Sequence, residues 1–332
     1  MSEKRRHQGP AIVALGGGHG LSAILRGLKL YTDDLTAIVT VADDGGGSGV
    51  LREDLGMPPP GDIRSCMEAL ADTESLMQQL LAYRFPDGRL AGQAFGNLLL
   101  AALDGISDSF DQAVARMSQV LAISGHILPV TNANVQLEAT FENGASVRGE
   151  SKISDAKKAQ NCRIHHVRLL PEHAPALPAA LDAIGRAEVI LLGPGSLYTS
   201  VIPNLLVDGI SEAIQDSTAL KIYVCNIMTQ DGETEGMTAQ DHLAALLEHG
   251  GPGLVDLCLY NSDPISRDLL ERYSAEDAEP MRVDRREVEL LGAEVVYRPL
   301  MDMECGYARH SGPKVAQAVL ELYRQRADTK VF

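Results

Sequence analysis

Two adjacent aspartates, Asp43 and Asp44, follow an apolar run and stand directly before three glycines, a serine and a further glycine. A carboxylate at the end of the second strand of a nucleotide-binding fold often bonds a ribose hydroxyl, and carboxylates also suit Mg²⁺. Aspartates occur in plain turns as well, but two of them before a run of glycines favour a functional loop. The pattern therefore predicts a ligand role for this pair and leaves open whether a sugar or a metal ion is bound.

A glycine-rich loop near the N-terminus precedes a helical pattern and is typical of phosphate binding. Gly16, Gly17 and Gly18 stand before His19, and their amides, with the N-terminus of the following helix, suit an anion. Leu21 occupies the place of the third glycine of the GxGxxG fingerprint, which argues against an NAD(P)-dependent oxidoreductase. A tight structural turn is the alternative reading, and His19 either donates to the phosphate or faces solvent.

A third loop, residues 193–200, ends another apolar run and reads GPGSLYTS. Its glycines free the backbone and its hydroxyl groups can donate hydrogen bonds, which suits a phosphate or pyrophosphate held without cations. The residues expected to contact such a ligand are Gly193, Gly195, Ser196, Leu197 and Thr199.

Polar residues further along the chain extend the same kind of site. Asn226 and Thr229 close the next apolar run, where they suit a base or a sugar or serve as ordinary turn caps. Arg309, in a loop expected before the terminal helix, either binds a phosphate through its planar guanidinium or lies on the surface. Asp62 follows three prolines and is expected to cap the next helix.

The apolar runs and the segments between them indicate a Rossmann-like, doubly wound α/β fold with a mainly parallel sheet. The runs are near-continuous, as in strands buried on both faces, and cover residues 11–15, 35–42, 187–192, 221–227 and 254–260. Apolar residues recur at helical spacing in residues 21–31, 205–215 and 239–250. Because each polar loop follows a strand, we expect all of them at the carboxyl edge of one sheet, where such folds bind ligands.

Two regions break this alternation, and both are expected to be insertions in a single domain spanning residues 11–326. Residues 64–125 carry mostly helical patterns and indicate an inserted helical layer. Residues 127–170 alternate and turn at an Asn-Gly pair, which indicates a small antiparallel β-subdomain. Residues 1–10 are expected to be a flexible terminus.

The composition excludes several classes of protein. The chain has 332 residues, and 29 Lys and Arg against 45 Asp and Glu give a net charge of −16, which repels nucleic acid and anionic membranes. The five cysteines form no CxxC pair, as in proteins of a reducing compartment. The N-terminus lacks the apolar core of a secretory signal, and no apolar run approaches the roughly 18 residues of a membrane span.

Several of these segments also match, in order, the motifs of a known family, from about residue 11 to about residue 324. The matching motifs are ALGGGHGLSAILRGLK, VTVADDGGGSGVLRED, PPPGDIRSC, FGNLLLAAL, GPGSLYTSVIPNLLV, NIMTQDGETEGMTAQDHL and MECGYARH. In these motifs the chain resembles the YvcK-type gluconeogenesis factors, which form a wider family with the 2-phospho-L-lactate transferases of coenzyme F420 synthesis.

The resemblance implies a cytoplasmic, Rossmann-like protein that binds UDP-N-acetylglucosamine and supports cell shape and wall synthesis during growth on gluconeogenic carbon. It implies that Tyr273, in LLERYSAED, and Arg309, in GYARH, serve ligand binding. Some members carry a threonine as a phosphorylation target shortly after this arginine. The chain reads His310-Ser311-Gly312 there, so Ser311 is the candidate substitute. No cofactor is expected to be required, and a homodimer is an open expectation.

The transferase branch supplies the alternative function, a Mg²⁺-dependent transfer of a phosphate-containing group. Phosphoryl chemistry needs mainly positioning and charge neutralisation, and Asp43 and Asp44 would then be metal ligands or a base. The DDGGGSG form of their loop differs from that of the transferase branch, which favours the regulatory, non-enzymatic branch.

Overall fold

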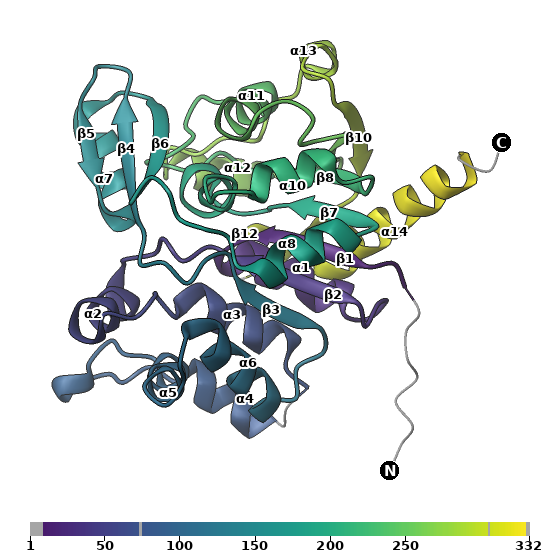
Figure 1. Ribbon diagram of the computed structural model, residues 1–332. Coiled ribbons are helices and arrows are strands. Elements are labelled where there is room, and N and C mark those ends of the chain that lie inside the picture. Colours follow the sequence, from purple (N-terminus) through teal and green to yellow (C-terminus); the bar gives the residue numbers. More distant parts are fainter. Residues whose placement is uncertain (1–8, 73–74, 305, 330–332) are drawn as a thin grey trace.

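A seven-stranded parallel sheet forms the centre of the protein (Figure 1). The computed structural model describes residues 9–72, 75–304 and 306–329. The strand order is β10-β9-β8-β7-β1-β2-β3, and every neighbouring pair is parallel. The strands are β1 (Ile12–Gly16), β2 (Leu35–Val39), β3 (His126–Pro129), β7 (Val189–Leu192), β8 (Leu220–Val224), β9 (Leu257–Asn261) and β10 (Glu294–Arg298). The winding direction reverses between β1 and β7, which is the switch point of a doubly wound fold.

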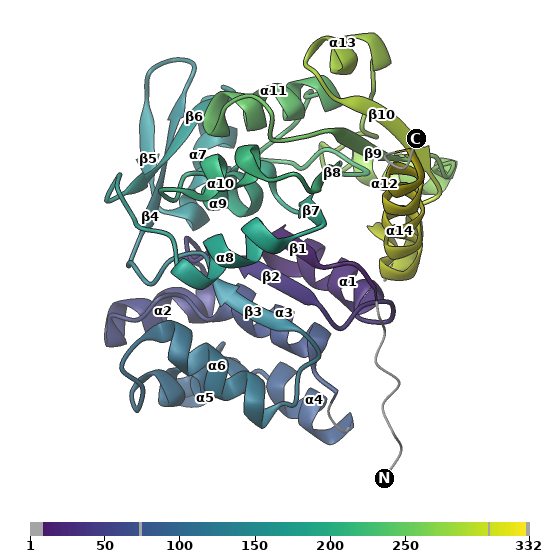
Figure 2. The same cartoon turned by 45° about the vertical axis from the view of Figure 1, so that its right-hand side comes forward.

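Helices cover both faces of this sheet (Figure 2). On one face lie α1 (Gly18–Leu28), α3 (Gly61–Leu70) and α14 (Gly312–Thr329), and on the other lie α8 (Pro178–Arg186), α9 (Ile202–Leu205), α10 (Ile210–Asp216) and α11 (Ala239–Gly250). Right-handed crossovers that leave the switch point in opposite directions place their helices on opposite faces. The predicted fold class is confirmed.

The continuous apolar sequence of the strands reflects burial on both faces. Every residue of β1, β2, β7 and β8 is buried, as expected for the inner strands of a parallel sheet. The core that they form is mostly aliphatic, and among the described residues Tyr223 and Phe141 are the largest fully buried side chains.

The glycine-rich run after Asp44 is helical, in contrast to the predicted loop. Helix α2 (Gly46–Leu55) starts inside it, with Gly45 as its N-cap. A Cβ at Gly49 would clash with the backbone oxygen of Asp44, so the tight turn into this helix requires a glycine there. Next come α3 and the helices α4 (Ser75–Ala82), α5 (Phe95–Asp104) and α6 (Phe110–Val120). They form the predicted helical layer in the lower part of Figure 1.

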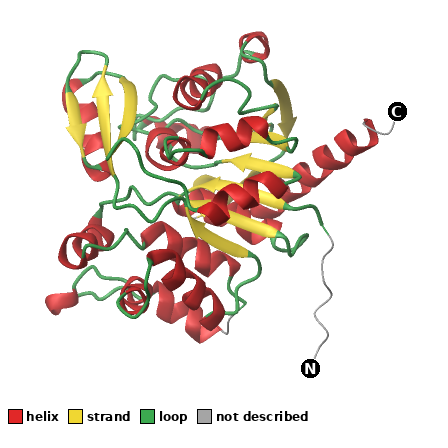
Figure 3. Ribbon diagram, in the orientation of Figure 1, coloured by secondary structure: helices red, strands yellow, loops and turns green. Residues whose placement is uncertain are grey.

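The antiparallel subdomain starts later than predicted and contains a helix (Figure 3). It consists of β4 (Gln136–Phe141), β5 (Ser146–Arg148), α7 (Glu150–Gln160) and β6 (Ile164–Leu170), with the strand order β5-β4-β6. The prediction began the antiparallel strands at residue 127, but β3 pairs in parallel with β2. As the edge strand of the main sheet, β3 is only partly buried, so its sequence lacks the continuous apolar run of an inner strand.

The segment before α14 is a hairpin rather than the predicted loop. After β10, strand β11 (Met301–Glu304) pairs antiparallel with β12 (Tyr307–His310). Helices α12 (Arg267–Ser274) and α13 (Arg285–Leu290) lie between β9 and β10 in the chain.

The helix predicted over residues 205–215 is interrupted, because α10 begins after Gly209, whose φ of 91° favours glycine. Residues 1–8 of the predicted flexible terminus lie outside the described residues. Within the described part of the chain, no helix is long and apolar enough to cross a membrane.

Candidate functional site

The first and third loops meet at the switch point, as predicted. A Cβ on Gly20 would lie 2.5 Å from the carbonyl oxygen of Pro194 and 3.0 Å from the amide nitrogen of Gly195. The two backbones therefore touch without an intervening side chain. Asn204 strengthens the junction, since its side-chain amide donates to the carbonyl oxygen of Gly16 at 3.2 Å and to that of Ser200 at 2.9 Å. Gly20, one residue before Leu21, therefore allows this close contact between the two loops.

Asp62 lies against the first loop and does not cap its own helix. The N-cap of α3 is Pro60, without a side-chain hydrogen bond. The Asp62 carboxylate instead accepts from the backbone N–H of Gly18, and a Cβ on Gly17 would clash with it. Burial, followed by the neighbouring charge of Asp43, raises the pKa of Asp62 to about 7. The predicted cap is wrong, because the helix N-terminus points this carboxylate into the site.

The two adjacent aspartates of the second loop point to different partners. Asp43 accepts a hydrogen bond from the amide of Gly45 at 2.8 Å, and burial raises its pKa. Asp44 accepts from the amide of Ser151 at 2.8 Å, and so caps the first turn of α7. Asp43 therefore faces the acidic centre of the site beside Asp62, whereas Asp44 fixes the subdomain to the sheet.

Glu150, the first residue of α7, is a site residue that the sequence did not predict. Its carboxylate accepts a hydrogen bond from the hydroxyl of Thr199, in the third loop. Burial, followed by the charge of Asp43, raises the pKa of Glu150 to about 8. Carboxyl oxygens suit Mg²⁺, but among the residues that the structure describes, no three His, Cys, Asp or Glu side chains converge closely enough to hold a metal ion.

A carboxylate of the chain itself occupies part of the third loop. Glu233 is 3% exposed, and its Oε1 accepts from the amides of Tyr198 at 2.8 Å and Thr199 at 3.1 Å. Burial raises the pKa of this carboxyl to about 7. These two amides lie in the loop that the sequence assigned to a phosphate, and they already bind a carboxyl group of the chain itself. The side chain of Leu197 is fully buried, which restricts the predicted contact to the backbone.

Residues that follow β8 form hydrogen bonds with the start of the third loop. The hydroxyl of Ser196 donates to Oε1 of Gln230 at 2.7 Å, and the side-chain amide of Asn226 donates to the carbonyl oxygen of Gly195 at 3.0 Å. Ser196 and Asn226 therefore lie at the same edge as Gly193 and Gly195, as predicted. His19, from the predicted first loop, lies in the first turn of α1 and is exposed.

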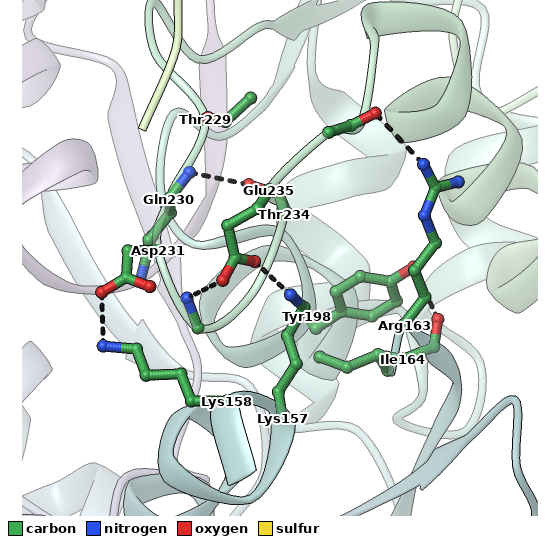
Figure 4. Close-up of polar contacts among 12 residues, drawn as sticks. Lys157, Lys158, Arg163, Ile164, Tyr198, Thr229, Gln230, Asp231, Thr234 and Glu235 are labelled. Carbon is green, nitrogen blue, oxygen red and sulfur yellow. Dashed lines mark hydrogen bonds and ion pairs between the residues drawn. The ribbon is translucent and has the colours of Figure 1, made fainter. Parts of the chain in front are cut away.

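Ion pairs join the loop that follows β8 to helix α7 of the subdomain (Figure 4). Lys158 and Lys157 of α7 form ion pairs with Asp231 and Glu235 of this loop. Thr229, at its start, is 4% exposed and exchanges two hydrogen bonds with the backbone of Glu279, of 2.7 and 2.9 Å. Thr229 is therefore a brace for this loop in the structure, rather than an exposed contact for a base.

Tyr273 and Arg309 lie beside the carboxyl end of β8, on α12 and β12. Tyr273 is 7% exposed, in a small apolar cluster with Ile227 and Ala308, whereas the side chain of Arg309 is exposed. His310, the next residue, contacts the carbonyl oxygen of Cys225 through Nε2 at 3.1 Å. This small cluster therefore stands next to Asn226 at the ligand edge.

Ser311 is a poor target for a kinase in this fold. Its side chain is 5% exposed and hydrogen-bonds to Asp302. A Cβ on Gly312, the position after it, would clash with the backbone oxygen of Ala23 in α1. The close approach of α14 to α1 thus excludes a side chain at residue 312.

The fold and the switch-point loops define a Rossmann-like α/β protein with a ligand edge of the nucleotide-binding kind. The profile of the family described as 2-phospho-L-lactate transferase CofD matches residues 12–301. The chain belongs to this family, and within it to the YvcK-type gluconeogenesis factors.

Curated relatives and solved structures support this assignment over nearly the whole chain. The gluconeogenesis factor of Halalkalibacterium halodurans is 47% identical over 93% of this chain and 95% of its own length. The gluconeogenesis factor of Bacillus subtilis is 46% identical over 96% of this chain and 99% of its own length. A crystal structure of a UPF0052 family member from Bacillus halodurans superposes with a TM-score of 0.90, at 46% identity, and covers 93% of this chain and 99% of its own.

Proposed function

We propose that this chain is a regulatory protein that binds UDP-N-acetylglucosamine at the carboxyl edge of its sheet and supports cell shape and wall synthesis during growth on gluconeogenic carbon. The observation that carries the proposal is the contact of two glycine-rich backbones at the switch point, Gly20 against Pro194, where doubly wound folds bind nucleotides. The name gluconeogenesis factor, borne by its relatives, supports the biological role. The cysteine usage supports a cytoplasmic location.

The raised carboxyl pKa values reconcile an anionic ligand with an acidic site. A diphosphate would be repelled by a cluster of ionised carboxylates. Burial raises the pKa of Asp62 to about 7 and that of Glu150 to about 8. Near neutral pH, Asp62 is therefore partly protonated and Glu150 is largely protonated. In the proposed complex these carboxyl groups donate hydrogen bonds to phosphate or sugar oxygens, while the backbone of Gly17 and Gly195 approaches the diphosphate closely.

Arg309→Ala is expected to weaken binding of UDP-N-acetylglucosamine by about 10- to 100-fold, the range for loss of a charge-assisted hydrogen bond. The measurement is isothermal titration calorimetry on the full chain. Arg267→Ala is the matched control, because this exposed arginine on α12 pairs with Glu271 on its own helix. If the parent protein does not bind the ligand, or both variants bind it as the parent does, the proposal is rejected.

The match to a transferase family keeps one alternative in place. In that case the protein is a Mg²⁺-dependent transferase of a phosphate-containing group, and Asp43 rather than Asp44 serves it, because Asp44 is committed to α7. Mg²⁺-dependent turnover of a nucleotide-linked donor that Asp43→Asn abolishes would establish this activity. Binding without turnover, with or without Mg²⁺, would leave the regulatory function.

A further inference from the structure

The hydroxyl of Tyr273 is fully engaged by the strand that carries Arg309. It donates to the carbonyl oxygen of Ala308 at 3.2 Å and accepts from the amide of the same residue at 3.1 Å. A phenol has one proton to donate, and Tyr273 has already used it. Its ring is buried among Ile227 and Leu269. Tyr273 therefore fixes both backbone polar groups of the residue before Arg309.

The residue after Arg309 is fixed as well. Nε2 of His310 donates to the carbonyl oxygen of Cys225, at the end of β8, at 3.1 Å. Side chains alternate along β12, so Ala308 and His310 face inward while Tyr307 and Arg309 share the outer face. Hydrogen bonds from Tyr273 and His310 thus fix the residues on both sides of Arg309, next to the carboxyl end of β8.

A second arginine lies at the same aromatic ring. The guanidinium carbons of Arg272 and Arg309 are each 5.6 Å from the ring centroid of Tyr307, within the range of cation–π attraction. Arg272 also donates to the carbonyl oxygen of Gly306 at 2.7 Å, and Tyr307 donates to Glu276 at 2.6 Å. Both arginine side chains are exposed, so two cations are gathered on the surface of a protein with a net charge of −16.

We propose that Arg272 and Arg309 form a paired site for a phosphate group around Tyr307, and that Tyr273 is a positioning residue that acts through the backbone of Ala308 without touching the ligand. Two guanidinium groups with donors to spare suit one phosphoryl group better than a sugar hydroxyl. The assignment of that phosphate to the nucleotide sugar rests on the function proposed above. It gives Arg272 a role in binding and gives Tyr273 an indirect one.

A double-mutant cycle between Tyr273→Phe and Arg309→Ala tests the indirect role. Calorimetry with UDP-N-acetylglucosamine is expected to show about tenfold weaker binding for Tyr273→Phe and about 10- to 100-fold weaker binding for Arg309→Ala. If Tyr273 acts only through Arg309, the double variant binds as Arg309→Ala alone does. Additive losses, or no loss in Tyr273→Phe, would overturn the indirect role. Arg272→Ala is expected to cost about fivefold or more, and unchanged affinity would overturn the arginine pair.

A second measurement needs no ligand and separates positioning from contact. In unliganded Tyr273→Phe, hydrogen exchange at residues 307–310 is expected to rise about tenfold, because Ala308 loses both partners. A residue that only touches the ligand would leave this exchange unchanged. Tyr297→Phe is the control, since Tyr297 is an exposed tyrosine on β10, 41% accessible.

A titration with pyrophosphate separates failure of the proposed function from failure of the paired site. If the parent protein binds no UDP-N-acetylglucosamine, inorganic pyrophosphate is titrated in its place. Pyrophosphate binding that is lost in both Arg272→Ala and Arg309→Ala supports the paired site while removing the nucleotide sugar. No binding of either anion overturns the paired site together with the proposed function.

Discussion

Asp62→Asn is expected to raise the free energy of unfolding by about 2–4 kcal/mol at about pH 8, even though it removes a candidate site residue. Burial and the neighbouring charge of Asp43 raise the pKa of Asp62 to about 7. At pH 8 its carboxylate is therefore ionised, although it is desolvated and close to another acid. Asparagine keeps an oxygen that accepts from the amide of Gly18, and its side-chain NH₂ can donate to Asp43. The substitution therefore removes a buried charge without removing the hydrogen bond to the first loop.

The sign of this effect depends on pH. Folded Asp62 keeps its proton up to a pH of about 7, whereas the unfolded chain releases it near pH 4. The folded state thus binds more protons between these values, and the free energy of unfolding falls as the pH rises through them. At about pH 5 both forms of residue 62 are neutral in the folded state, so the advantage of asparagine is expected to shrink to about 1 kcal/mol.

The measurement is urea unfolding of the parent and the variant at both pH values, without added divalent cation. Asp108→Asn makes the same change of charge on an exposed residue between α5 and α6 and is expected to shift stability by less than about 0.5 kcal/mol. Other titrating groups cancel in the difference between the variants. If Asp62→Asn is less stable than the parent at pH 8, or gains the same free energy of unfolding at both pH values, the Asp62 carboxylate is not desolvated in the folded protein.

The sheet and its ligand edge could be predicted because local sequence determines them. β-branched runs followed by glycine or aspartate mark strands buried on both faces, and parallel topology brings the ends of those strands together. Helix α11 could be predicted at its observed bounds, residues 239–250, from its apolar residues at helical spacing. In the structure, Thr238 and Asp241 form a capping box at its start, and Gly251 caps its end. Loops that follow β1, β2 and β7 had to meet for the same topological reason.

The acidic side of the site depends on contacts that the sequence does not display. Helix α7 buries few apolar side chains, so its sequence lacks the apolar spacing that predicts an amphipathic helix. Its first turn is fixed by Asp44, 107 residues earlier in the chain. That long-range contact also brings Glu150 into the site. Glu233 likewise reaches the third loop across 35 residues. In both cases the ligand edge contains groups whose position is set by tertiary packing rather than by local propensity.

Gly20→Ala is expected to lower the free energy of unfolding by about 3 kcal/mol and to weaken ligand binding by at least about 100-fold. The added methyl group would lie 2.5 Å from the carbonyl oxygen and 2.8 Å from the carbonyl carbon of Pro194. Neither atom belongs to a flexible side chain that could rotate away. The first and third loops must therefore separate, and the close backbone contact between them at the switch point is lost.

Gly185→Ala is the matched control, because it adds the same methyl group within a helix. Gly185 lies in α8, and a Cβ there meets no atom within 4 Å. Alanine at this position is expected to stabilise the protein by about 0.5–1 kcal/mol through its higher helix propensity. Urea unfolding and calorimetry on both variants give the comparison. If Gly20→Ala behaves as Gly185→Ala does, the two loops are not in close contact, and backbone packing at the switch point does not require glycine at residue 20.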